Sequence, residues 1–368
     1  MIVFGPARAG HAAGLHCRRA GPVDFRTWKN IMSNPSSISL GSLLRRPETC
    51  SFLGLLAVFI FFAIFGGSNF VSITGAASWL NVAASLGIVA IPVGLLMIAG
   101  ELDISIGSMI PAGSMTVAII SGHFHAPILL GIVAALGLGA LVGFVNGTLV
   151  VRTAVPSFIV TLGTLFAIAG LVLGLSVIIT GTTSVAIAAG PEAKFLLGQF
   201  IGGILQVTIF WWIAAALAFG FILHYSRYGN WILAMGGDKV SARNAGIPTE
   251  RMTVLLFMAS SVSAAFVGVS QAILYNSAQV SAGQSYIFNA IISVVVGGVL
   301  LTGGYGSVVG IVLGTLTFAI VNQGIYYTGF DANWASLIIG VLLLLAVLMN
   351  NTFRKMALSY SPSKGKAK

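Results

Sequence analysis

Charged residues are scarce in this sequence. Only 7% of its 368 residues are charged, with 8 Asp or Glu against 18 Lys or Arg, whereas a soluble domain carries about 25%. So few charges cannot cover the surface of a water-soluble fold of this length. Hydrophobic residues make up 57%, which excludes intrinsic disorder. The 46 glycines show no three-residue period, which excludes collagen.

Cysteines and catalytic motifs are also few or missing. Cys17 and Cys50, the two cysteines, precede the first long apolar run and give no reason to expect a disulfide framework. The phosphate-binding pattern G-x-x-x-x-G-K-[ST] and the zinc pattern H-E-x-x-H occur nowhere. No Ser/His/Asp arrangement for hydrolysis is visible either. The chain itself is therefore not expected to be an enzyme or to bind ATP, a metal or another cofactor.

What the sequence does contain is a series of long apolar runs. They predict an all-α polytopic membrane protein with about ten transmembrane helices. Two pairs, 80–99 with 104–121 and 287–303 with 306–328, are each also compatible with one broken helix or with a re-entrant segment buried in protein. The expected spans are residues 51–67, 80–99, 104–121, 126–150, 155–179, 203–224, 252–275, 287–303, 306–328 and 333–350.

Three regions follow from these spans. Residues 49–352 form the transmembrane domain, and residues 353–368 form a basic cytoplasmic tail. Residues 1–48 are a second basic tail, which lacks the apolar run of a secretory signal. This tail is interpreted either as a disordered segment or as partly an over-extended start, because Met32 opens a more ordinary leader than residues 1–31 do.

The positions of the basic residues predict the orientation. With ten spans and a cytoplasmic N-terminus, 17 of the 18 Lys and Arg residues lie on the cytoplasmic side and only Lys194 lies outside. The positive-inside rule predicts this asymmetry. The net charge of +10 is therefore read as a topology signal and not as a sign of nucleic-acid binding. Both termini are expected in the cytoplasm.

Several glycines recur four residues apart. Small residues at this spacing form a flat helix face that lets another backbone approach closely. Helix packing within the chain is the expected use, and a face between two subunits is the alternative. The glycines are Gly139, Gly143 and Gly147, then Gly306, Gly310 and Gly314, with Gly170 and Gly174 repeating the spacing.

Two of the eight acids, Glu101 and Asp103, lie between two apolar runs. An ionisable group at a membrane span is costly and usually functional, so these acids are candidates for a pathway or gate. Capping of the next helix by Asp103 or Ser105 is the structural alternative, and interhelical hydrogen bonds are the alternative for the other polar residues. The full candidate set is Asn81, Glu101, Asp103, Ser105, Asn146, Ser157, Thr161 and Asn289.

The long interior loop from Tyr225 to Arg251 is predicted to contain a short helix over residues 239–245. Asp238 suits the N-cap of this helix. Gly246 suits its C-terminal stop, and Pro248 follows shortly after. A surface that docks another protein is the favoured interpretation, and a plain connecting loop is the alternative.

Four motifs together resemble the membrane permease subunit of bacterial ABC importers for ribose, xylose, galactose and related monosaccharides. The resemblance covers about residues 70–355. The motifs are Gly100-Glu101-Leu102-Asp103-Ile104-Ser105-Ile106-Gly107-Ser108; Asn146-Gly147 followed by Val155-Pro156-Ser157-Phe158-Ile159-Val160-Thr161-Leu162-Gly163-Thr164; the 235–248 loop; and Val296-Gly297-Gly298 with Gly303-Gly304-Tyr305-Gly306-Ser307.

The resemblance implies a transport subunit that works by alternating access in the bacterial inner (plasma) membrane. Its implied partners are ABC ATPase subunits that hold ATP and Mg, a second permease subunit in a homodimer or heterodimer, a periplasmic sugar-binding protein and the lipid bilayer. The loop then corresponds to the coupling helix that contacts the ATPase, through Gly236, Gly237, Asp238, Ser241, Ala242, Arg243, Gly246, Ile247 and Pro248. A stand-alone secondary transporter or channel for a small polar solute, with Glu101 and Asp103 relaying protons, is the alternative.

Overall fold

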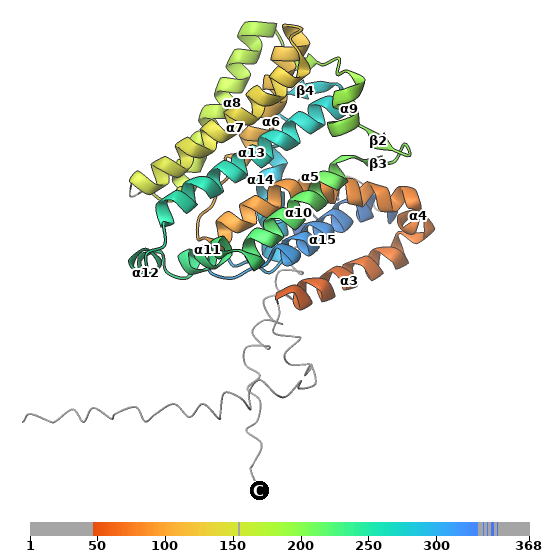
Figure 1. Cartoon of the computed structure of the whole chain (residues 1–368). Coiled ribbons are helices and arrows are strands. Elements are labelled where there is room, and N and C mark those ends of the chain that lie inside the picture. The colour runs from red at the N-terminus through yellow and green to blue at the C-terminus, as the bar shows by residue number, and fades with distance from the viewer. Residues whose placement is uncertain are drawn as a thin grey trace, which may run out of the picture.

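The computed structural model describes residues 47–153 and 155–329, together with positions 334, 337, 340, 341 and 344. Most of the predicted span 333–350 and nearly all of the two predicted basic tails therefore lie outside the described residues. The described residues fold mainly into helices (Figure 1).

Six helices of the described region are long and apolar enough to cross a membrane. They are α5 (Ile73–Ile98), α7 (Ile128–Arg152), α8 (Ser157–Thr180), α10 (Thr208–Tyr225), α13 (Thr249–Tyr275) and α15 (Val308–Gly324) with the 3-10 turn η2 (Ile325–Tyr327). The other helices are α3 (Pro47–Phe65), α4 (Gly67–Val71), α6 (Ile106–Val117) with the π-helix η1 (Ala118–His123), α9 (Pro191–Leu197), α11 (Arg227–Gly237), α12 (Lys239–Asn244) and α14 (Gln284–Val296).

Two pairs of predicted spans, 80–99 with 104–121 and 287–303 with 306–328, are by sequence also compatible with one broken helix or a re-entrant segment. In the structure each pair is two separate helices, one of which is short. Seven residues separate α5 from α6, and α6 has only 12 residues before its π-helical end. In the second pair, α14 has 13 residues and ends well before α15. In the described region, six of the ten predicted spans are therefore helices that are long and apolar enough to cross a membrane.

Four short strands depart from the predicted all-helical fold. β1 (Ser184–Ala186) pairs antiparallel with β4 (Ser277–Gln279), and β2 (Phe200–Ile201) pairs with β3 (Leu205–Gln206) in a hairpin. The hairpin turn contains Gly202 and Gly203 at φ values of 62° and 77°, a conformation that glycine adopts without steric cost. The predicted span at 203–224 is therefore too long at its start, since α10 begins only at Thr208.

The long helices connect two ends of the molecule. α11 and α12 lie at one end, which we call the α12 end, and α9 with the β2–β3 hairpin lies at the opposite end (Figure 1). Asn81 fixes the hairpin to α5: its Nδ2 donates to the Ile204 carbonyl at 2.9 Å, and its Oδ1 accepts from the Gln206 N–H at 2.9 Å. This predicted pathway residue thus holds a turn at the end opposite α12.

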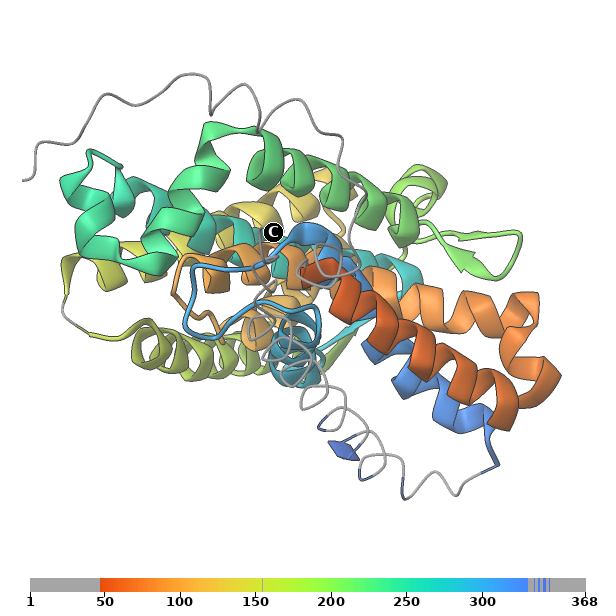
Figure 2. The ribbon, with the colours of Figure 1, turned by 90° about the horizontal axis from the view of Figure 1, so that it is seen from below.

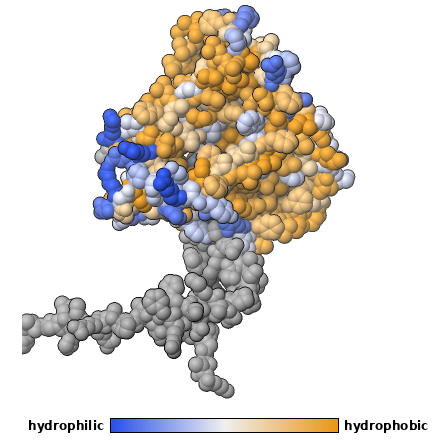
Figure 3. Space-filling view, in the orientation of Figure 1, coloured by the Kyte–Doolittle hydropathy of each residue, from blue (hydrophilic) through white to orange (hydrophobic). Residues whose placement is uncertain are grey.

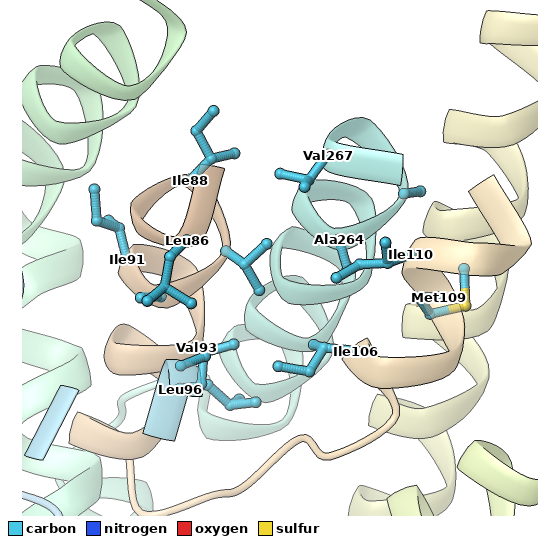
Figure 4. Packing of buried hydrophobic residues seen from close by; sticks show 14 of the residues in the cluster. Leu86, Ile88, Ile91, Val93, Leu96, Ile106, Met109, Ile110, Ala264 and Val267 are labelled. Atoms are coloured by element: carbon cyan, nitrogen blue, oxygen red, sulfur yellow. The ribbon is translucent and has the colours of Figure 1, made fainter. Parts of the chain in front are cut away.

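α5 and α6 form the centre of the fold. Every residue of α5 from Ala83 to Ile98 is buried, as expected of a helix that is apolar on all sides. Side chains of Leu96 from α5, Ile106 from α6 and Val267 from α13 point into the space between these three helices (Figure 4). Figure 2 shows α3 alongside α15 at the edge of this core.

The outer helices expose broad apolar surfaces. Phe166 and Ile178 of α8 are 69% and 81% exposed, and Leu217 of α10 is 70% exposed. Figure 3 shows this hydrophobic surface over most of the visible face, with hydrophilic residues gathered where Figure 1 places α11 and α12. Apolar surface this extensive is not found on soluble monomers and matches the hydrocarbon of a bilayer.

Glycines bring α7 against α13. A Cβ at Gly143 would lie 2.5 Å from Cα of Met258, and a Cβ at Gly147 would lie 2.6 Å from Cα of Val254. Gly139, one turn earlier, faces Ser261 in the same way. The two backbones are therefore closer than any side chain at these positions would allow.

The second set of glycines joins α15 to α14, with Gly310 against the Gly297 carbonyl and Gly314 against the Ser293 carbonyl. Gly306, which precedes α15, faces the side chains of Ile98 and Val299 instead. In contrast, a Cβ at Gly170 or Gly174 would meet nothing within 4 Å. The repeat on α8 therefore points away from the other residues that the structure describes.

Candidate docking helix and buried polar network

The loop helix predicted over 239–245 is present as α12. Asp238 Oδ1 accepts a hydrogen bond from the Val240 N–H at 3.0 Å, and its Oδ2 accepts from Ser241 Oγ at 2.6 Å. The side-chain bond from Ser241 and the amide bond from Val240 lower the pKa of Asp238, because both stabilise the carboxylate. The cap is therefore complete above the ordinary pKa of 3.8 and is lost only as the pH falls below it.

α12 ends as the sequence predicts. Gly246 has a φ of 85°, and its N–H donates to the Arg243 carbonyl at 3.0 Å. The Ile247 N–H donates to the Ala242 carbonyl at 3.1 Å. These bonds satisfy the last carbonyls of the helix through a left-handed residue, so the chain turns at Gly246 before Pro248 and α13.

The side chains that α12 exposes differ from the predicted set at two positions, Ala242 and Val240. Ser241 and Arg243 are exposed, but Ala242 is buried. Its side chain therefore packs inward and is not available to a partner. The sequence analysis did not single out Val240, which is 68% exposed and is the large apolar side chain on the outer surface of α12.

Three chain segments are in contact just before α12: residues 98–100 at the end of α5, the end of α11, and the turn between α14 and α15. A Cβ at Gly236 would lie 1.8 Å from the Ile98 carbonyl oxygen and 2.3 Å from the Gly304 nitrogen. The Gly304 N–H itself donates to the Ile98 carbonyl at 2.8 Å. A Cβ at Gly303 would lie 3.0 Å from Cα of Gly100. We call these four residues, Gly100, Gly236, Gly303 and Gly304, the glycine junction.

The segment between α5 and α6, residues 99–105, is the linker that leaves this junction. Its Glu101 forms an ion pair with Lys239, the first residue of α12. The side chains of Lys239 and Glu101 are 39% and 12% exposed. The pair therefore ties the linker to the candidate docking helix at the edge of the protein interior.

Asp103 lies deeper in the linker and is completely buried. Its Oδ1 accepts from the Ser105 N–H at 3.0 Å and from Ser105 Oγ at 2.6 Å. Its Oδ2 accepts from Ser260 Oγ of α13 at 2.8 Å. A buried acid needs such donors to offset desolvation. Ser105 precedes α6 without capping it through its side chain.

The hydrogen bonds continue from Asp103 into α7 and α8. Asn146 Nδ2 of α7 donates to Ser105 Oγ at 3.0 Å, and Thr164 Oγ1 of α8 donates to Asn146 Oδ1 at 2.6 Å. Thr164, Asn146, Ser105, Asp103 and Ser260 thus form one chain of side-chain hydrogen bonds, which we call the buried network. It joins the linker to three helices.

The start of α8 holds the linker backbone directly. The Leu102 N–H donates to Ser157 Oγ at 3.1 Å, and the Ile104 N–H donates to Thr161 Oγ1 at 3.3 Å. Irregular backbone inside a membrane protein is tolerated where protein groups satisfy its amides. Ser157 and Thr161 therefore have a defined structural use.

Five of the eight predicted pathway residues are thus brought together around the linker: Asp103, Ser105, Asn146, Ser157 and Thr161. Of the other three, Glu101 belongs to the linker itself but pairs with Lys239 at the α12 end. Asn81 is at the opposite end, and Asn289 is half-buried on α14. No local sequence pattern distinguishes the five residues that meet around the linker from the other three, because the contacts join residues far apart in the chain.

A groove of about 670 Å³ lies between α7 and α8. Its walls are apolar, with Val145, Ile159 and Leu171 among the lining residues, and Thr164 of the buried network also lines it. A sugar needs several polar partners, so this groove by itself suits an apolar occupant such as a helix or an acyl chain.

The chain belongs to the family of permease components described as "branched-chain amino acid transport system / permease component", whose profile matches residues 75–347. Members of this family are permease components of transport systems and are not enzymes. The family and the six long apolar helices make the chain a multi-pass inner-membrane protein.

Similar proteins are named for sugar import. The ribose import permease protein RbsC of Escherichia coli (strain K12) is 31% identical over 303 residues, covering 81% of this chain and 92% of RbsC. The fructose import permease protein FrcC of Rhizobium meliloti is 28% identical, covering 84% and 87%. The xylose/arabinose import permease protein XylH of Sulfolobus acidocaldarius is 28% identical, covering 84% and 86%. No solved structure matches this chain.

Proposed function

We propose that this chain is the transmembrane permease subunit of an ATP-binding-cassette importer for a monosaccharide or a related polyol. The observation that supports this most is α12, a capped helix that exposes Val240 beyond the long helices of a permease-family chain. The chain has no nucleotide-binding motif, so ATP and Mg are held by the partner subunits. The substrate class comes from the relatives, which are named for ribose, fructose and xylose/arabinose.

The α12 end faces the cytoplasm in this proposal. Five basic residues lie at this end of the described region, and Lys194 lies in α9 at the opposite end. This distribution follows the positive-inside rule. Crossings by α3, by α6 with η1, and by the short α14 bring the count to nine, and the span that the sequence predicts over residues 333–350, mostly outside the described residues, would be the tenth. Both termini are then cytoplasmic. The five residues are Arg152, Arg227, Lys239, Arg243 and Arg251.

The transport cycle follows from this orientation. ATPase subunits dock at α12, a periplasmic sugar-binding protein docks at the end that holds α9, and two permease subunits enclose the pathway. The outward-facing Gly170 and Gly174 and the apolar α7–α8 groove suit a neighbouring permease helix. ATP-driven movement of α12 then rocks the helices around the pathway, as in alternating access.

Replacing Val240 with glutamate is expected to weaken ATPase docking. A carboxylate at this exposed position would have to be desolvated in an apolar contact, while the fold of the permease is left intact because the side chain touches solvent. The measurement is the amount of ATPase subunit that co-purifies with the tagged permease, together with sugar uptake. A fall of about tenfold in both is expected, equivalent to about 1.4 kcal/mol.

Gln199→Glu is the matched control, since it adds the same charge at an exposed position at the opposite end. It should co-purify the ATPase normally. Normal co-purification of the Val240→Glu variant would contradict the assignment of α12 as the docking helix.

A further inference from the structure

We infer that the Glu101–Lys239 ion pair transmits movement of α12 to the linker, and that Glu101 and Lys239 are positioning residues for coupling ATP hydrolysis to transport. This inference rests on the proposed function. It assigns Glu101 a use other than a pathway or a proton relay, because its carboxylate faces the first residue of α12.

The ion pair is placed to transmit a displacement. Its partners are 138 positions apart in the chain, so it joins α12 to the core by a route that the loop does not provide. Glu101 is 12% exposed, and partial burial strengthens an ion pair relative to one in open solvent. A shift of α12 therefore moves Glu101 or breaks a partly desolvated pair.

Beyond Glu101, hydrogen bonds join the linker to α8 and α13. The next amide along, Leu102 N–H, is held by Ser157 of α8, and the Ile104 N–H is held by Thr161. Asp103, between them, is held by Ser260 of α13. A displacement of Glu101 is therefore transmitted to α8 and α13 through the four consecutive linker residues 101–104.

The second ion pair of α12 provides an internal comparison. Arg243 pairs with Glu250 in the first turn of α13, and both side chains are largely exposed, at 64% and 54%. This pair joins α12 only to the helix that follows it in the chain. Like Glu101–Lys239 it joins a basic to an acidic side chain, but it makes no contact with the linker.

The test is a double-mutant cycle in the complete importer reconstituted into proteoliposomes. The variants are Glu101→Gln, Lys239→Gln and the two combined, with sugar uptake and ATP hydrolysis measured together. Each single variant should lower the sugar imported per ATP hydrolysed about fivefold, the size of a modest coupling free energy. The combined variant should lose no more than either single variant, because both remove the same contact. Glu250→Gln should retain the wild-type ratio.

Losses that multiply in the combined variant would overturn the inference, as would an unchanged ratio in the single variants. A parallel fall in folded protein, uptake and hydrolysis at a constant ratio would also overturn it, since that is the pattern of a merely structural pair. If the neutral variants fail to assemble, the charge swap Glu101→Lys with Lys239→Glu decides: recovered coupling supports the inference and absent coupling refutes it. A wild-type complex that imports no sugar would refute the proposed function instead.

Discussion

Replacing Gly236 with alanine is expected to leave little folded permease in the membrane. The added Cβ would lie 1.8 Å from the Ile98 carbonyl oxygen and 2.3 Å from the Gly304 nitrogen. Both are backbone atoms joined by a hydrogen bond, so neither can rotate aside as a side chain would. Overpacking a core typically costs about 1–3 kcal/mol, and a clash with paired backbone belongs at or above the top of that range. Size-exclusion profiles and melting temperatures in detergent measure the loss.

Gly237→Ala is the matched control for this substitution. Gly237 is the next residue in α11, and a Cβ there would meet nothing within 4 Å. It should leave the melting temperature unchanged or raise it slightly, because alanine favours the helix. Equal melting temperatures for the two variants would show that α5, α11 and the 297–307 turn are not packed as described at the glycine junction.

Replacing Asp103 with leucine is expected to have the second large effect. The substitution removes the acceptor for the Ser105 N–H, the Ser105 hydroxyl and the Ser260 hydroxyl. Each buried donor left without a partner costs about 1–3 kcal/mol. The variant should therefore unfold at a much lower temperature and support no measurable uptake. Ser260→Ala, which removes only one donor, should cause a smaller loss.

Asp103→Asn separates a structural role from proton relay. Asparagine keeps an acceptor oxygen in the buried network and cannot change its charge. A stable Asp103→Asn variant is expected to retain substantial uptake, because the carboxylate of Asp103 acts as a hydrogen-bond acceptor for Ser105 and Ser260. Abolished uptake in a variant as stable as the wild type would favour the stand-alone proton-driven transporter.

Local signals in the sequence were sufficient to predict α12. Asp238 and Gly246 mark its start and end through short-range backbone chemistry, and the observed helix begins directly after Asp238. The four-residue glycine spacing likewise indicated close helix packing, which the Gly143 contact with α13 illustrates. Such features depend on residues that are neighbours in the chain.

Long-range contacts could not be predicted in the same way. The partner of Glu101 lies 138 positions away, and nothing around either residue indicates the other. The β1–β4 pairing joins two three-residue strands that are too short for a recognisable alternation. The burial of Ala242 and the exposure of Val240 depend on how α12 sits against the other helices. Tertiary packing decides each of these outcomes.

The most direct measurement of the proposed function is sugar accumulation by proteoliposomes that contain this permease. Vesicles with and without the ATPase subunits are loaded with ATP and Mg, and a binding protein with labelled pentoses, hexoses and polyols is added outside. The predicted result is accumulation of at least one of these compounds only when the ATPase subunits and ATP are both present. Uptake at the same rate by the permease alone would contradict an ATP-driven importer and identify a stand-alone transporter or channel.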